Sequence, residues 1–199
     1  MTHKPFSQAC ENNKDPILQA ISTVFCLPTT IWEIGSGTGQ HACYFAKHLP
    51  HLEWQPTDRL ENIPGICLWQ QEVQSANLKP ALPLDVTDAA WPCNAIDALF
   101  TANTLHIMSG DEVQIFFDRL AVYLNPKALV CIYGPFNYNG AYTSASNARF
   151  DQWLKNQNTL SGIKNFEDIL FLATFRDFNL ITDVTHPPLK KRIISGWKK

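Results

Sequence analysis

Residues 32–41 read WEIGSGTGQH. A short apolar run at residues 30–34, which contains the acidic Glu33, leads into three alternating glycines, and a helix-like segment follows at residues 42–49. This order predicts a strand, a tight glycine turn and a helix start. Glycine accepts positive φ and lets a ligand approach the backbone, and a new helix offers free N–H groups and a positive dipole end. The stretch therefore predicts a site for a nucleotide-like or carboxylate-bearing small molecule.

The glycine spacing narrows the ligand class. The dinucleotide fingerprint is G-x-G-x-x-G, whereas Gln40 stands here where its third glycine belongs. No Lys-Ser/Thr pair follows the turn, so the phosphate loop is absent as well. Glu33 disfavours a pyrophosphate and favours a cationic ligand group. A tight turn that binds no ligand is the alternative at this point.

An acid followed by three glycines at every second position resembles the first motif of class I S-adenosylmethionine-dependent methyltransferases. The resemblance implies S-adenosylmethionine (or S-adenosylhomocysteine) as cofactor. It also implies cofactor contacts from Glu33, Gly35, Ser36, Gly37 and Gly39.

Asp58 ends a second predicted strand at residues 53–57. It follows Gly39 by 19 residues, close to the ~20 expected for an acid that binds ribose. A carboxylate at this position can accept hydrogen bonds from both ribose hydroxyls.

Asp85 and Val86 follow a third apolar run at residues 81–84. In the methyltransferase family an acid at this point commonly accepts a hydrogen bond from the adenine amino group, so the resemblance implies cofactor binding here. The alternative is that Asp85 caps a helix, because Asp is a favoured N-cap residue.

The chain alternates strands and helices from end to end. Strands are predicted at 30–34, 53–57, 81–84, 96–102, 128–134, 179–185 and 189–196. Helices are predicted at 15–25, 39–49, 60–71, 111–124, 146–157 and 166–176. Pro16 is expected in the first turn of the first helix, and Pro64-Gly65 interrupts the helix at 60–71. Strands joined by helices pair in parallel, with right-handed crossovers. The last two strands are separated only by residues 186–188, too few for a crossover helix, so an antiparallel hairpin is expected.

These elements predict an α/β doubly wound three-layer sandwich with a mostly parallel seven-stranded sheet that ends in an antiparallel hairpin. This is the Rossmann-like methyltransferase fold that the resemblance implies. At 199 residues, a single domain over 1–199 is expected. Residues 1–26 are expected to form an N-terminal lid and helix, with 6–13 folding over the cofactor, and 135–177 a helical cap region.

Composition limits the partners. A net charge of −2 and a pI near 6.3 argue against bulk electrostatic binding of nucleic acid. No segment approaches the ~18 apolar residues of a membrane helix, and no apolar signal core occurs at the N-terminus. Six cysteines without a C-x-x-C pair favour reduced thiols and a cytoplasmic location. Pro50 separates His48 from His51, so no metal site is expected.

Ligands of a doubly wound sheet bind outside the carboxyl ends of its strands. Asn103 and His106 follow the fourth predicted strand and are expected to face the transferred methyl group, with Asn103 also binding the cofactor. Tyr133 and Phe136 follow the fifth and are expected to form a pocket wall. His106 is the candidate general base because imidazole titrates near neutral pH, and Tyr133 is a second catalytic candidate. Ordinary packing is the alternative for both.

A closer resemblance covers roughly residues 7–180. The chain resembles a group of methyltransferase-like proteins known mainly as a conserved domain of unknown function. The resemblance rests on A-x-E-x-N-x-D-P-I-L at 9–18, N-x-x-H-I at 103–107, Y-G-P-F at 133–136 and T-S-x-S-N-x-x-F-D-x-x-L at 143–154. It departs from the group at Asn12, where an Arg is usual, and at residues 186–190.

The leading hypothesis is methyl transfer from S-adenosylmethionine to a small-molecule acceptor, with neither nucleic acid nor membrane as partner and the oligomeric state open. Two alternatives remain. A nicotinamide-dependent oxidoreductase shares the strand, glycine turn and ribose acid. A catalytically silent adenosylmethionine-binding module would act through a protein partner.

Overall fold

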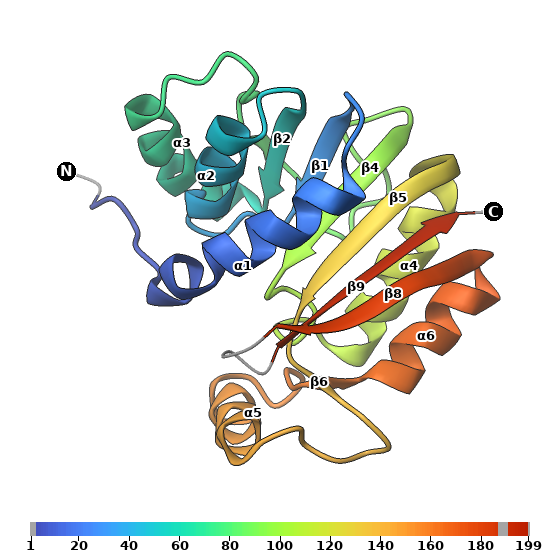
Figure 1. Ribbon diagram of the computed structural model, residues 1–199. Coiled ribbons are helices and arrows are strands. Elements are labelled where there is room, and N and C mark those ends of the chain that lie inside the picture. Colours follow the sequence, from blue (N-terminus) through green and yellow to red (C-terminus); the bar gives the residue numbers. More distant parts are fainter. Residues whose placement is uncertain (1–2, 187–190, 199) are drawn as a thin grey trace.

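A computed structural model describes residues 3–186 and 191–198. Seven strands form one sheet in the order β3-β2-β1-β4-β5-β9-β8 (Figure 1). The sheet strands are β1 Thr30–Ile34, β2 Glu53–Asp58, β3 Leu82–Pro83, β4 Ile96–Ala102, β5 Leu124–Gly134, β8 Phe178–His186 and β9 Lys191–Lys198. The α-helices are α1 Gln8–Val24, α2 Gln40–His48, α3 Ile63–Glu72, α4 Gly110–Tyr123, α5 Ala145–Gln157 and α6 Phe166–Phe175.

Strands β1 to β5 run parallel, and β9 pairs antiparallel with both β5 and β8. The predicted fold class is confirmed: a doubly wound sheet ends in an antiparallel hairpin. The strand order reverses at β1: β2 and β3 are added on one side of it, and β4 and β5 on the other, so that β1 and β4 are hydrogen-bonded neighbours. The carboxyl ends of these two strands therefore form the switch point at which such sheets bind ligands.

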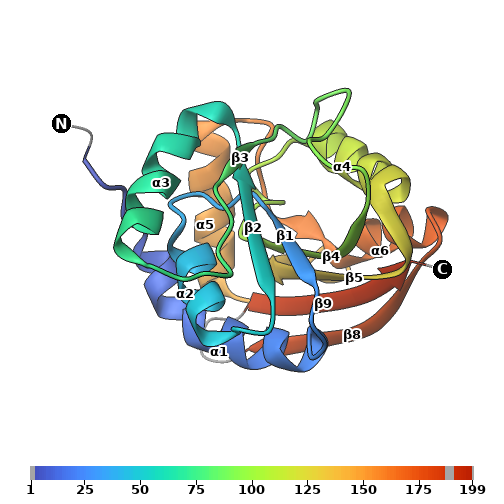
Figure 2. The same cartoon turned by 90° about the horizontal axis from the view of Figure 1, so that it is seen from above.

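Helices cover both faces of the sheet, with α1, α2 and α3 on one side and α4 and α6 on the other (Figure 2). Alternate residues of a strand face opposite sides, and the buried side chains separate accordingly. Phe100 and Tyr133 pack with α1 and α2, whereas Leu99 and Ile132 pack with α4 and α6. The two apolar cores fix the strand ends that carry the site.

The N-terminal helix is longer than predicted. It begins at Gln8 instead of residue 15, because the Ser7 hydroxyl caps it by accepting a hydrogen bond from the Cys10 amide at 3.4 Å. Pro16 therefore lies inside α1 and not in its first turn. Its missing N–H costs one helical bond, which packing of Ile17 and Ile21 against the sheet offsets.

Other boundaries differ for local reasons. The segment predicted as helix 60–71 forms a 3-10 turn, Leu60–Asn62, followed by α3, and Pro64 stands in the first turn of α3, where a missing N–H costs nothing. Strand β3 keeps only two residues, and β5 begins at Leu124. A short parallel pair, β6 Phe136–Asn137 and β7 Lys164–Asn165, was not predicted. Of the departure at 186–190, residues 187–190 lie outside the described residues.

Helix α5 lies beyond the carboxyl end of β5, whereas α6 packs on the sheet face beside α4 and β8 (Figure 1). Of the two helices in the region predicted as a cap, α5 is therefore the one at the carboxyl edge of the sheet. Among the described residues, no helix is long and apolar enough to cross a membrane. All six cysteines are free.

Candidate active site

A cavity of about 430 Å³ opens at the carboxyl ends of β1, β2 and β4. The start of α1, the glycine turn, the turn after β3 and the segment after β4 contribute its walls. Its polar lining includes Ser7, Ser36, Thr38, His41, Asp58, Arg59, Asn62, Asp85, Asn103, Thr104, Glu112 and Asn158, and its apolar lining includes Ile34, Leu84, Val86, Ile107 and Met108. A concave site that combines apolar contacts with convergent polar groups suits a small ligand.

The glycine turn adopts a conformation that other residues would resist. Gly35 has φ +76°, and a Cβ on it would lie 2.7 Å from Thr104 Cγ2. The backbone amides of Gly35 and Ser36 both donate to the Thr57 carbonyl, at 3.0 and 2.9 Å. These bonds tie the turn to the end of β2, so Ser36 and Gly37 present their backbone to the cavity. Gly35, Ser36 and Gly37 all line it, as the sequence predicts.

Asp58 holds the turn from the other side. Its Oδ2 accepts the Gly37 amide at 2.6 Å, and its Oδ1 accepts the Arg59 amide at 2.7 Å and Asn62 Nδ2 at 2.8 Å. A carboxylate has about four acceptor positions, so about one is left for a ligand. Asp58 lines the cavity at the end of β2, and binding both ribose hydroxyls would require it to release one of these protein donors.

Asp85 and Val86 lie on the wall that continues from β3. The Asp85 Oδ1 accepts hydrogen bonds from the Thr87 amide and hydroxyl, at 2.9 and 2.7 Å. Burial acts to raise the pKa of Asp85, but these bonds and the charge of Arg59 hold the pKa below its ordinary value. The carboxylate is thus ionised at neutral pH. No helix starts within residues 86–95, so the helix-cap alternative for Asp85 is wrong.

Two residues predicted to bind the cofactor lie behind the turn and do not line the cavity. Glu33 is 1% exposed, and its Oε2 accepts Trp54 Nε1 at 2.9 Å. Burial raises the pKa of Glu33 to about 7. The charge of Asp58 acts in the same direction, whereas hydrogen bonds from Trp54 and Ser36 act to lower the pKa. Gly39, the N-cap of α2, is packed where a Cβ would lie 3.0 Å from Ile66 Cα. Glu33 and Gly39 therefore pack behind the glycine turn, on the side away from the cavity.

Asn103 lines the cavity in a left-handed conformation with φ +59°, and its backbone amide donates to the Tyr133 carbonyl at 2.8 Å. His106 does not line it. Its ring packs edge-on against Phe150 at 5.1 Å between centroids. The backbone turns after Asn103, where the backbone amides of Ile107 and Met108 both donate to the Thr104 carbonyl.

Residues one helical turn apart share a side. Thr104, Ile107 and Met108 therefore face the cavity, and His106 faces away from it.

Tyr133 also lies off the cavity. It is 1% exposed on the sheet face under α1, where it contacts the Asn13 side chain, and burial raises its pKa far above the ordinary value. Strand alternation explains the position, because Tyr133 shares its face with Cys131. Phe136 is likewise a core residue beside α4. Neither aromatic ring forms the expected wall.

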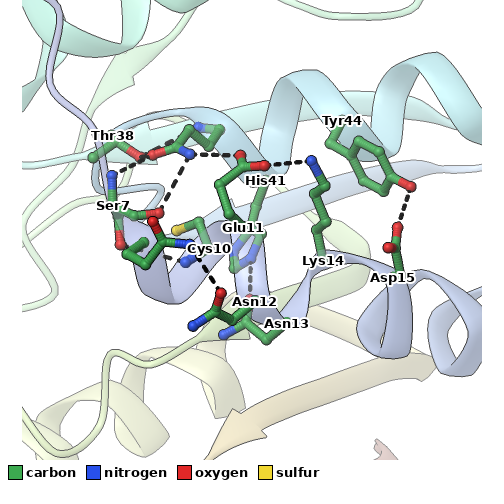
Figure 3. Close-up of polar contacts among 12 residues, drawn as sticks. Ser7, Cys10, Glu11, Asn12, Asn13, Lys14, Asp15, Thr38, His41 and Tyr44 are labelled. Atoms are coloured by element: carbon green, nitrogen blue, oxygen red, sulfur yellow. Dashed lines mark hydrogen bonds and ion pairs between the residues drawn. The ribbon is translucent and has the colours of Figure 1, made fainter.

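His41 lines the cavity and was not singled out from the sequence, whereas Ser7 and Cys10, which also line it, belong to the segment 6–13 that was expected to fold over the cofactor. His41 is 4% exposed in the first turn of α2, and one ring nitrogen, Nε2, lies 2.7 Å from Asn13 Oδ1 (Figure 3). The position of His41 directly after the glycine turn could have indicated from the sequence that it lies at the site. Ser7 and Cys10 reach the site only because α1 packs across α2, a contact between segments about 30 residues apart.

The chain matches a known family over residues 4–199. It belongs to the family described as "Protein of unknown function (DUF938)". Solved structures show the fold at low identity. An O-methyltransferase family protein from Burkholderia thailandensis has a TM-score of 0.83 at 14% identity, over 96% of this chain and 57% of that one. The S-adenosylmethionine-dependent methyltransferase SibL, in its apo form, has a TM-score of 0.79 at 16% identity, over 95% and 55%.

The chain thus spans a little over half the length of those two proteins. The YcgJ protein from Bacillus subtilis matches along its whole length, with a TM-score of 0.71 at 11% identity, over 95% of this chain and 99% of that one. This DUF938 protein therefore has the fold of S-adenosylmethionine-dependent methyltransferases, as the sequence resemblance predicts.

Proposed function

We propose that this DUF938 protein binds S-adenosylmethionine in the cavity and transfers its methyl group to a small-molecule acceptor. The observation that carries the proposal is the position of the cavity. It lies at the switch point between β1 and β4, with the glycine turn on one side and two carboxyl groups, those of Asp58 and Asp85, along one wall. The methyltransferase fold of the comparison proteins supports the same cofactor.

The residues present fit this cofactor. Asp58 keeps about one acceptor position for a ribose hydroxyl, and Asp85 can accept from an adenine amino group. Their negative charge suits a ligand that carries a sulfonium cation. The bound cofactor supplies an activated methyl group for in-line displacement, so the protein contributes positioning and exclusion of water.

The far wall of the cavity, after β4, is where an acceptor would lie. Ile107 and Met108 provide apolar contact there, and Glu112 and Asn158 provide polar contact. Glu112 on this wall and His41 beside the glycine turn replace His106 as groups lining the cavity that could accept a proton from an acceptor. Neither is obligatory, because an acceptor that is already deprotonated needs no base.

Titration calorimetry with S-adenosylhomocysteine, the product form, tests the cofactor. We expect micromolar binding by the wild type and at least tenfold weaker binding by Asp58→Asn, since a hydrogen bond to a charged group contributes ~1.5–3 kcal/mol. Glu61→Gln is the matched control, because Glu61 is exposed, lies three residues away and pairs with Arg59. Equal affinities of wild type and Asp58→Asn would remove Asp58 from the site.

No binding by the wild type at high protein concentration would refute the proposal. Binding without turnover over a broad panel of small acceptors would instead favour a catalytically silent adenosylmethionine-binding module.

A further inference from the structure

The N-terminal segment that leads into α1 runs from α3 to the start of α2 and is fastened at two points. At the first, residues 4 and 5 lie on α3. The Lys4 ammonium stands 3.5 Å from the ring centroid of Trp69 and pairs with Glu72, and Trp69 Nε1 donates to the Pro5 carbonyl at 2.7 Å. The Pro5 ring sits directly over Gly65, where a Cβ would lie 2.7 Å from Pro5 Cγ. Gly65 thus leaves the space that Pro5 occupies.

The second fastening is at Gln40, the first residue of α2. Its Oε1 accepts the Ser7 amide at 2.6 Å and the Thr38 hydroxyl at 3.0 Å. Its Nε2 donates to Glu11 Oε1 at 2.8 Å and lies 3.4 Å from the Ser7 carbonyl oxygen. Figure 3 shows Ser7, Glu11 and Thr38 gathered where the start of α1 meets α2.

Gln40 is 4% exposed, so its amide group makes these bonds out of water. A buried amide with satisfied donors and acceptors fixes the relative position of the groups it joins. One side chain therefore joins the glycine turn, through Thr38, to the start of α1, through Ser7 and Glu11.

At the second fastening, Ser7, Ala9 and Cys10 form a wall of the cavity. We propose that Gln40 is a positioning residue that holds this N-terminal wall, residues 4–10, against the glycine turn, and that ligand leaves the cavity when the wall is released. The proposal rests on the proposed function for the identity of the ligand, but the position of the wall can be measured without any ligand.

The first test exchanges the two partners of the hydrogen bond between Gln40 and Glu11. Gln40→Glu removes the Nε2 donor and places a carboxylate against Glu11. We expect amide hydrogen exchange of residues 4–10 to speed up at least tenfold in the ligand-free protein. We also expect S-adenosylhomocysteine to dissociate about tenfold faster. Adding Glu11→Gln restores a donor and an acceptor in exchanged order, so the double variant should return to within about threefold of the wild type in both measurements.

Tyr44→Phe is the matched control. The Tyr44 hydroxyl donates to Asp15 Oδ1 at 2.5 Å on the same α1–α2 contact, but away from the cavity. Its loss should leave both the exchange of residues 4–10 and the dissociation rate unchanged. If Tyr44→Phe accelerates them as much as Gln40→Glu does, or if Gln40→Glu leaves exchange at the wild-type rate, Gln40 has no special part in holding the wall and the proposal is overturned.

Gly65→Ala gives an independent test, because helix propensity and the proposal predict opposite effects of this substitution. Gly65 lies in the first turn of α3, and alanine forms helix more readily than glycine, so helix propensity alone predicts a protein at least as stable with unchanged binding. The added Cβ would instead push Pro5 off α3, and we expect faster exchange of residues 4–10 with faster dissociation of S-adenosylhomocysteine. Unchanged exchange would contradict the proposal.

Failure of the wild type to bind S-adenosylhomocysteine would refute the proposed function. The exchange measurements on ligand-free variants would then still decide whether Gln40 holds the wall.

Discussion

Glu33 shows how one buried acid couples the glycine turn to pH. The carboxyl group lies under the turn with a pKa raised to about 7, mainly by burial. A raised folded-state pKa means that the folded protein binds the proton more tightly than the unfolded chain does. The contribution of protonated Glu33 to the free energy of unfolding is therefore fully present below the unfolded-state pKa of about 4.5, and it is lost as the pH rises through about 7.

Glu33→Gln removes this titration and keeps an oxygen for the Trp54 indole N–H. We expect the free energy of unfolding of the variant, relative to the wild type, to increase by ~1–3 kcal/mol between pH 5 and pH 8. Urea unfolding at the two pH values measures it. Glu61→Gln, at an exposed position, should follow the wild type. Parallel pH profiles of Glu33→Gln and wild type would show that Glu33 does not titrate in this range.

Single residues were predictable from sequence where their chemistry depends on neighbours in the chain. The glycine turn, Asp58 at the end of β2 and Asp85 just after β3 reach the cavity because each follows directly from a neighbouring strand in the chain. His106 was misplaced because a single helical turn after β4 directs it away from the cavity. Tyr133 was misplaced because alternation along a strand does not tell which face is which.

At the scale of elements, amphipathic segments were the predictable ones. Helix α4 has regularly spaced apolar residues and was predicted to within one residue at each end. The first turns of α1 are polar, QACENNK at residues 8–14, so periodicity did not reveal them. They are held by the Ser7 cap and by contacts with α2, which only the folded chain brings together.

The capping box of α4 gives a prediction for an element. The Ser109 hydroxyl accepts the Glu112 amide at 3.1 Å, and Glu112 Oε2 accepts the Ser109 amide at 2.6 Å. We expect Ser109→Ala to lower the free energy of unfolding by ~1 kcal/mol, measured by urea unfolding. Ser22→Ala, inside α1, is the control and should be neutral or stabilising. An unchanged stability of Ser109→Ala would mean that solvent serves the helix end equally well.

At the scale of the molecule, the cavity joins two halves of one sheet. Gly35, Asp58 and Asp85 come from the half built on β1 to β3, and Asn103 and Met108 from the half that begins with β4. The apolar clusters on the two faces both span these halves. A ligand in the cavity contacts both halves, so its binding opposes unfolding of the whole chain and not of one segment.

This arrangement lets thermal unfolding distinguish the two cofactor classes. A ligand at ~100 times its Kd stabilises the folded state by ~2.7 kcal/mol, which corresponds to a rise in Tm of ~5–11 °C for a domain of this size. We expect S-adenosylhomocysteine to produce this rise in one cooperative transition, and NADH at the same concentration to produce none. The physical reason lies at α2, where Gln40 is bonded to Ser7 and Glu11 and occupies the position of the third dinucleotide glycine. A rise with NADH alone would overturn the methyltransferase proposal and favour a nicotinamide-dependent oxidoreductase.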